Sequence, residues 1–239
     1  MKKADVMIKN AYIITMDNDR TIISNGCIVI DKDKITAVGG GELASGYEAS
    51  RVVDAKGKFV FPGMISTHSH LFQTMLKGLG RDKLLFDWLD SSVRTALHRF
   101  DGEMCYYAAL TGCMEAIQSG TTTILDYMYC HTSPGLSDYV TQAMEDIGIR
   151  GIYGRGFTNT ANFPPEFKVA HHDTEQDMFD DVKRLYRKYQ GHSRMSVALA
   201  PGIIWDNTDD GYREMRKMAN EMHIPLTMHV LESEDDDKY

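Results

Sequence analysis

Cysteine pairs and long apolar runs are both missing from this sequence. Its 239 residues contain four cysteines, at positions 27, 105, 113 and 130, and no two of them form a Cys-x-x-Cys pair. This spacing argues against a cysteine zinc site, a dithiol redox pair and a disulfide framework. No run approaches the roughly 18 apolar residues of a membrane span, and no apolar segment follows the two lysines near the N-terminus. The sequence therefore predicts a protein of the reducing cytoplasm, with no membrane partner.

Positive charge and glycine-rich phosphate motifs are also scarce. Lysine and arginine number 26 against 34 acidic residues, which gives a net charge of −8 and argues against nucleic acid as the main partner. Neither a G-x-G-x-x-G motif nor a Walker-type loop follows the apolar strands, so dinucleotide-binding and P-loop sheets are disfavoured. A hydrophobic content of 43% is that of an ordinary globular protein.

Short strands fill the first quarter of the chain. Residues 1–58 are rich in β-branched side chains, are divided by Asn, Asp and Gly turn signals, and show no helical period. We expect strands within residues 5–16, 26–33, 34–40 and 49–60. The segment predicts a small all-β domain, part of a β-sandwich.

From residue 59 onward the rhythm changes to alternation of strands and helices. The sequence predicts five apolar strands, at residues 59–67, 121–127, 150–158, 195–202 and 225–232. The helical segments between them lie at residues 101–120, 136–148, 173–191 and 209–223, after a long excursion over residues 71–100. Such alternation is typical of a parallel sheet covered by helices, either an open doubly wound sheet or part of a closed barrel.

Histidines stand at the ends of two of these strands. The stretch "FVFPGMISTHSH" places His68 and His70 two residues apart, so that in a strand their side chains point to the same side. His229 ends the fifth strand, and reactive residues of parallel barrels gather at such C-terminal ends. Three neutral imidazoles suit zinc or iron. Glu232, three residues later, suits proton transfer from a metal-bound water to a leaving amine.

A plainer interpretation exists for every histidine. Taken alone, a His-x-His pair is more often two surface side chains on a loop than a metal site. Surface positions are expected for the remaining histidines, which are His98, His131, His171, His172, His192 and His223. Among these, His131 follows the second strand and is the one with a route to the cavity.

The motifs resemble those of the amidohydrolase superfamily. The resemblance rests on P-G-x-x-x-x-H-x-H in "FPGMISTHSHLFQ", on "GTTTILDY" and on "PLTMHVLESE", and it extends over nearly the whole chain. The similar group comprises aminohydrolases and chlorohydrolases that act on amino-substituted heteroaromatic rings. The implied fold is α/β, with a small β-sandwich domain at residues 1–58 and the first five β/α units of a TIM-type (β/α)8 barrel at residues 59–239.

The same resemblance implies roles for six residues. His68, His70 and His229 match metal ligands, and Glu232 matches the proton-shuttling glutamate of the deaminating members. Gln73 and Trp88 match positions that line the substrate pocket. The stretch "MSVALAPG" contains no lysine to bridge two metals, so one divalent transition metal is expected, zinc before iron.

The chain departs from the family pattern at its C-terminal end. The family completes its site with a histidine at strand six and an aspartate at strand eight, and this sequence stops just after strand five. We therefore expect an N-terminal half, inactive alone and part of a homo-oligomer when complete. The implied reaction is hydrolytic removal of an exocyclic amine from a purine-, pterin- or triazine-like small molecule. The alternatives are a chlorohydrolase on a related ring and a non-catalytic barrel fragment that acts only as an interaction protein.

Overall fold

The computed structural model describes residues 1–159, 173–204 and 206–234. The chain divides into two compact units, Met1–Gly63 and Met64–Tyr239. Among the residues that are described, no helix is both long and apolar enough to span a membrane.

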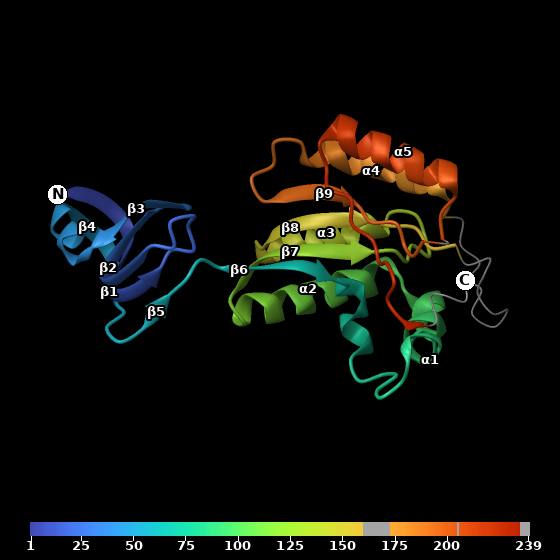
Figure 1. Cartoon of the computed structure of the whole chain (residues 1–239), viewed down its shortest axis with the longest axis horizontal. Coiled ribbons are helices and arrows are strands. Elements are labelled where there is room, and N and C mark those ends of the chain that lie inside the picture. Colours follow the sequence, from blue (N-terminus) through green and yellow to red (C-terminus); the bar gives the residue numbers. More distant parts are fainter. Residues whose placement is uncertain (160–172, 205, 235–239) are drawn as a thin grey trace. The chain divides into compact units, whose positions relative to one another are not determined.

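The first unit is a mixed sheet of five strands (Figure 1). The strands are β1 (Lys2–Ile14), β2 (Ile22–Asp31), β3 (Lys34–Gly40), β4 (Tyr47–Asp54) and β5 (Phe59–Val60), with a 3-10 helix, η1, at Gly41–Gly46. The order is β3-β2-β1-β4, antiparallel from β3 to β1 and parallel between β1 and β4. The prediction of a β domain is confirmed. Residues 1–63, all of which are described, form one sheet, not both layers of a sandwich.

The apolar pair Phe59–Val60 belongs to this first unit. The sequence predicts that it is part of the first barrel strand, whereas in the structure Tyr12 pairs with Phe59 and Ile13 with Val60. Pro62 follows, and a proline has no N–H to continue a ladder. The barrel strand therefore begins two residues later, at Met64.

The second unit contains four parallel strands in the order β6-β7-β8-β9. They are β6 (Met64–Ser69), β7 (Thr121–Met128), β8 (Arg150–Arg155) and β9 (Met195–Leu199). The intervening helices are α2 (Gly102–Gln118), α3 (Leu136–Ile147), α4 (Glu175–Tyr189) and α5 (Asp209–Met222). Helix α2 packs on β7, α3 on β8, and α4 and α5 on β9 (Figure 1). Strands and helices in this order form part of a (β/α)8 barrel.

Side-chain caps fix where three of these helices begin. Asp101 accepts a hydrogen bond from the backbone N–H of Met104 at the start of α2. Thr174 and Asp177 form a reciprocal capping box at α4, and Thr208 caps α5. Each cap satisfies backbone donors that have no partner inside the helix, which stabilises a helix by about 1 kcal/mol.

A short-helix excursion joins β6 to α2. It comprises η2 (Leu71–Leu76), α1 (Leu85–Leu89), the π-helical turn η3 (Asp90–Arg94) and η4 (Leu97–Arg99). Phe72, Val93 and Leu97 are buried in the main core of the unit. The segment therefore stays folded against the sheet, beside the C-terminal ends of the strands.

The predicted fifth strand is reduced to a single bridge. Leu199 donates to the Pro225 carbonyl at 2.9 Å and accepts from the Thr227 N–H at 3.0 Å, which makes one parallel bridge with Leu226. To extend the ladder in one direction, residue 201 would have to donate its backbone N–H, and in the other direction residue 225 would have to do so. Both residues are prolines, which have no N–H. The prediction of a regular strand over residues 225–232 is therefore wrong, although the segment lies beside β9 as expected.

Candidate metal centre and adjoining cavity

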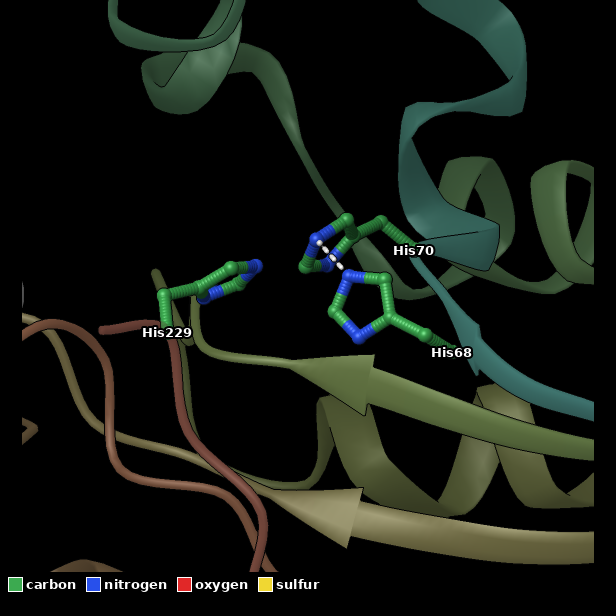
Figure 2. A group of neighbouring side chains, drawn as sticks. All are labelled: His68, His70 and His229. Carbon is green, nitrogen blue, oxygen red and sulfur yellow. Dashed lines mark hydrogen bonds between the residues drawn. The ribbon is translucent and has the colours of Figure 1, made fainter. Parts of the chain in front are cut away.

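Three histidine rings converge at the C-terminal end of the parallel sheet. His68 lies in β6, His70 follows that strand directly, and His229 comes from the segment after the Leu226 bridge. One ring nitrogen from each residue lies within 4.8 Å of the other two, and Nε2 of His68 is 3.1 Å from Nε2 of His70. Figure 2 shows the rings turned toward a common point. The alternation of strand side chains places the first two, and the bridge with β9 brings in the third.

Backbone carbonyls on neighbouring strands orient two of the rings. Nδ1 of His70 donates to the carbonyl of Tyr127 on β7 at 2.6 Å. This bond fixes the tautomer and leaves Nε2 of His70 as an acceptor. The ring of His229 donates to the carbonyl of Gly202, which also accepts from the Tyr127 hydroxyl at 2.6 Å. A second bond from that hydroxyl reaches the Pro201 carbonyl. The ends of β7 and β9 thus hold the histidine cluster.

The neutral form of the imidazoles is favoured by the burial of His70 and His229 and by the partial burial of the more exposed His68. Burial lowers the pKa of His70 to about 4, and the hydrogen bond to the Tyr127 carbonyl has a smaller effect that raises this pKa. Burial is also the main cause that lowers the pKa of His68 and of His229. All three rings are therefore uncharged near neutral pH, which is the form that binds metal.

The donor set fits a zinc ion. With Zn–N bonds of about 2.0–2.1 Å and tetrahedral angles, ligand nitrogens lie about 3.3 Å apart. The 3.1 Å between the Nε2 atoms of His68 and His70 is close to that value. Three protein ligands with a further position left for water or substrate is the arrangement of catalytic zinc sites, whereas structural sites use four protein ligands.

A cavity of about 320 Å³ adjoins the histidine cluster. Most of its apolar wall comes from the excursion between β6 and α2, with Ile203 added after β9; the residues of the excursion are Leu85, Phe86, Trp88, Leu89, Val93 and Leu97. Its polar lining consists of the three histidines, Gln73, Arg94, Tyr129, Thr158, Asp206 and Glu232. The side-chain amide of Gln73 donates to the Tyr129 hydroxyl at 2.8 Å. A mostly apolar cavity with a few placed polar groups is typical of a small-molecule site.

Glu232 lines the same cavity as the three histidines. Its negative charge raises the pKa of His68, against the larger lowering effect of burial. The structure thus brings all six predicted site residues to one cavity. The three histidines and Glu232 lie at one end, and Gln73 and Trp88 lie on the surrounding wall. Their individual roles stay predictions.

His131 lies in neither of the places considered for it. It is only 4% exposed, so the expectation of a surface position is wrong, and it does not line the cavity beside the histidine cluster. Its Nδ1 accepts from the guanidinium of Arg155 at 2.9 Å, and Nε2 is 3.0 Å from the Tyr153 hydroxyl. Arg155 also pairs with Asp173 and Asp181. This charge network, assembled from distant segments, explains the burial.

His192 and His223 are exposed, as predicted. The remaining histidines of that prediction, His171 and His172 and the side chain of His98, lie outside the described part of the chain.

Two further cavity residues are not predicted from the sequence motifs. Tyr129 follows β7 and Asp206 follows β9, and both line the cavity. The signal available in the sequence was position, because each comes within a few residues of the C-terminal end of a predicted parallel strand. Burial raises the pKa of Asp206 to about 7.

Comparison with known proteins shows the family of this chain. The model of the amidohydrolase family matches residues 59–239, and the chain belongs to that family. The curated 5'-deoxyadenosine deaminase of Methanosarcina mazei is 32% identical over 233 residues, which cover 97% of this chain and 50% of that protein. The chain thus spans about half the length of the curated relatives it matches.

Solved structures show the same architecture. A zinc-bound adenosine deaminase from Xanthomonas campestris has a TM-score of 0.83 and 18% identity, over 98% of this chain and 51% of that one. A zinc complex of the atrazine chlorohydrolase from Arthrobacter aurescens has a TM-score of 0.81 and 21% identity, over 98% and 55%. The predicted fold class, a partial barrel preceded by a β domain, is confirmed.

Proposed function

We propose that this chain carries the metal-binding half of a hydrolase that removes an exocyclic amine from a heteroaromatic ring. The observation that supports the proposal most strongly is the shared cavity, in which three neutral imidazoles and the carboxylate of Glu232 line one end. His68, His70 and His229 hold one divalent metal, zinc before iron. The match to a 5'-deoxyadenosine deaminase favours purine-type substrates, and pterin- and triazine-like rings remain in the same chemical class.

The proposed reaction is a hydrolytic displacement. A bound zinc ion supplies Lewis acidity that makes a water molecule nucleophilic near neutral pH. The carboxylate of Glu232 accepts one proton of that water while the water oxygen bonds to the ring carbon that carries the amine. Glu232 then passes that proton to the neighbouring ring nitrogen, and it carries the remaining proton of the added hydroxyl group to the leaving amine. The C–N bond breaks, and the products are ammonia and the ring carbonyl compound.

The side chains of the excursion and of β7 position the substrate. Trp88 and Phe86 on the apolar wall offer aromatic surfaces on which a flat heterocycle stacks. Gln73, held by its bond to Tyr129, presents an amide to the ring edge. A substrate ring packed against this wall excludes all water except the nucleophile.

A chlorohydrolase remains the second candidate, because the atrazine chlorohydrolase is among the structural neighbours. Glu232 favours the amine, since ammonia must be protonated to leave and chloride need not be. A purely interacting role for this fragment has less support. It does not explain why three uncharged imidazoles and a carboxylate meet at an apolar cavity.

The proposed compartment and partners of the protein rest on its cysteines and its net charge. All four cysteines are free and buried, which agrees with the proposed reducing cytoplasm. A small-molecule substrate is the proposed partner, and the net charge of −8 does not suit nucleic acid. Assembly of the complete protein into a homo-oligomer stays a prediction.

The activity is expected to require residues beyond this chain. Met64 and Ile65 on the outer strand β6 are 55% and 67% exposed, and Val230 and Leu231 at the opposite end of the sheet are 57% and 78% exposed. Apolar side chains on unpaired edges favour self-association until further strands cover them. We therefore expect residues 1–239 alone to associate and to release no ammonia from aminopurines, aminopterins or amino-triazines.

A protein extended to the length of the relatives is expected to release ammonia from at least one of these rings. Gel filtration and an ammonia assay on the two proteins check this. Steady turnover by a monomeric protein of residues 1–239 would show that the chemistry needs no further residues.

A further inference from the structure

Asp206 occupies a defined position at the end of β9. Its backbone N–H donates to the Ile203 carbonyl at 2.9 Å, which closes a turn, and its Oδ2 accepts from the Ile203 N–H at 3.3 Å. The backbone of Asn159 also donates to the carboxyl group. The residue is only 6% exposed, yet it lines the cavity that the three histidines adjoin. The carboxyl group is therefore fixed in the cavity wall.

Gly202 makes the room for this carboxyl group. A Cβ placed on Gly202 would overlap Oδ2 of Asp206 and lie 2.7 Å from the Phe157 carbonyl oxygen. The carboxyl group thus takes the space that any other residue at position 202 would fill with its own side chain. The Gly202 carbonyl accepts from the ring of His229. Asp206 and His229, a candidate metal ligand, therefore both adjoin Gly202.

The chemistry of the carboxyl group selects for hydrogen-bond donors. An ionised carboxylate offers about four acceptor positions, of which the backbone donors of Ile203 and Asn159 and the side chain of Thr158 use three. Burial raises the pKa of this carboxyl group to about 7, and the positive charge of Arg94, another residue of the cavity lining, opposes that rise and favours the ionised form. Burying an acceptor without a partner costs about 1–3 kcal/mol. A bound ring without a donor facing Asp206 would incur that cost.

We propose that Asp206 is a specificity-determining residue, which accepts a hydrogen bond from an amino group or ring N–H on an edge of the substrate away from the leaving amine. The inference rests on the proposed function, which places a heteroaromatic ring in this cavity. In this proposal Asp206 determines which ring binds, and Glu232 transfers the protons. The preferred substrates are rings that carry a second amino group or an N–H besides the amine that is removed.

Two purines that differ by one amino group test the inference. In the complete zinc-loaded protein, 2,6-diaminopurine is expected to bind roughly 10- to 100-fold more tightly than adenine and to show the same preference in kcat/KM, the size set by one unpaired buried acceptor. Asp206→Asn should abolish the preference, because the carboxamide can keep its oxygen toward Ile203 and then presents N–H groups to the ring. Calorimetric dissociation constants and initial rates of ammonia release are measured on both proteins.

Matched controls separate this role from a structural one. Asp210→Asn removes a carboxylate whose side chain is 96% exposed and should leave both the preference and the rates unchanged. Thermal unfolding shows whether Asp206→Asn remains folded. If wild type and the folded Asp206→Asn variant bind the two purines with the same ratio, Asp206 does not select the ring. If the preference depends on Asp206 but neither purine releases ammonia, the specificity role stands and the proposed deamination of these purines is wrong.

Discussion

Glu232→Gln is expected to lower the rate of ammonia release about 10²–10⁴-fold, the usual contribution of a general acid–base group. Glutamine has nearly the shape of glutamate but takes up no proton from water, so the nucleophile and the leaving amine both lose their proton carrier. Two of the imidazoles are held by other groups, because His70 and His229 donate to the carbonyls of Tyr127 and Gly202. Zinc content should therefore stay unchanged, as measured by elemental analysis beside the rate assay.

Glu234→Gln is the matched control, since Glu234 is an exposed glutamate two residues further along. It should retain the rate of the unaltered protein. Loss of zinc in Glu232→Gln would make Glu232 a ligand and not a proton carrier. An unchanged rate on an amine substrate would contradict the proposed deaminase chemistry.

His70→Ala is expected to weaken zinc binding by roughly 10²–10⁴-fold. Zinc held by protein ligands is worth about 10–16 kcal/mol, so the loss of one of three ligands removes about 3–5 kcal/mol. His70 also contacts Tyr127 through Nδ1, and the alanine leaves that carbonyl without its donor. Competition with a zinc chelator measures the affinity.

His223→Asn is the control for removing a histidine. His223 is exposed and caps α5 with a positive φ of 53°, a conformation that asparagine tolerates. Its zinc affinity should match that of the unaltered protein. Equal zinc affinity in His70→Ala and the unaltered protein would exclude His70 as a ligand.

Local chemistry made much of the fold predictable. Strand–helix alternation predicted the parallel sheet, and helices α2 and α4 lie within the predicted ranges 101–120 and 173–191. The spacing of His68 and His70 predicted neighbouring rings because the period of a strand is two residues. Such signals are readable because each depends on only a few adjacent residues.

Two boundaries were harder because they depend on pairing partners. Phe59–Val60 has the composition of a core strand, and nothing local shows that it pairs with β1. The segment 225–232 also reads as a strand, but its ladder with β9 is limited to one bridge. The prolines at 201 and 225 were visible in the sequence, yet their effect appears only once the register between the two segments is known.

Charge networks and cavity walls could not be predicted from spacing. His131 is buried because Arg155, itself held by Asp173 and Asp181, donates to it, and these residues come from separate segments. Asp206 reaches the cavity wall only because Gly202 leaves space for its carboxyl group. Such positions require the packed structure, because their environment comes from residues far apart in the chain.

The number of zinc ions held by one chain tests the central claim most directly. Zinc is added in excess to metal-free protein, unbound ions are removed by gel filtration, and zinc and protein are quantified in the same fractions. For the complete protein the account predicts one zinc ion per chain, bound through His68, His70 and His229, because the stretch "MSVALAPG" offers no lysine to bridge a second. Two ions per chain, or none, would contradict it.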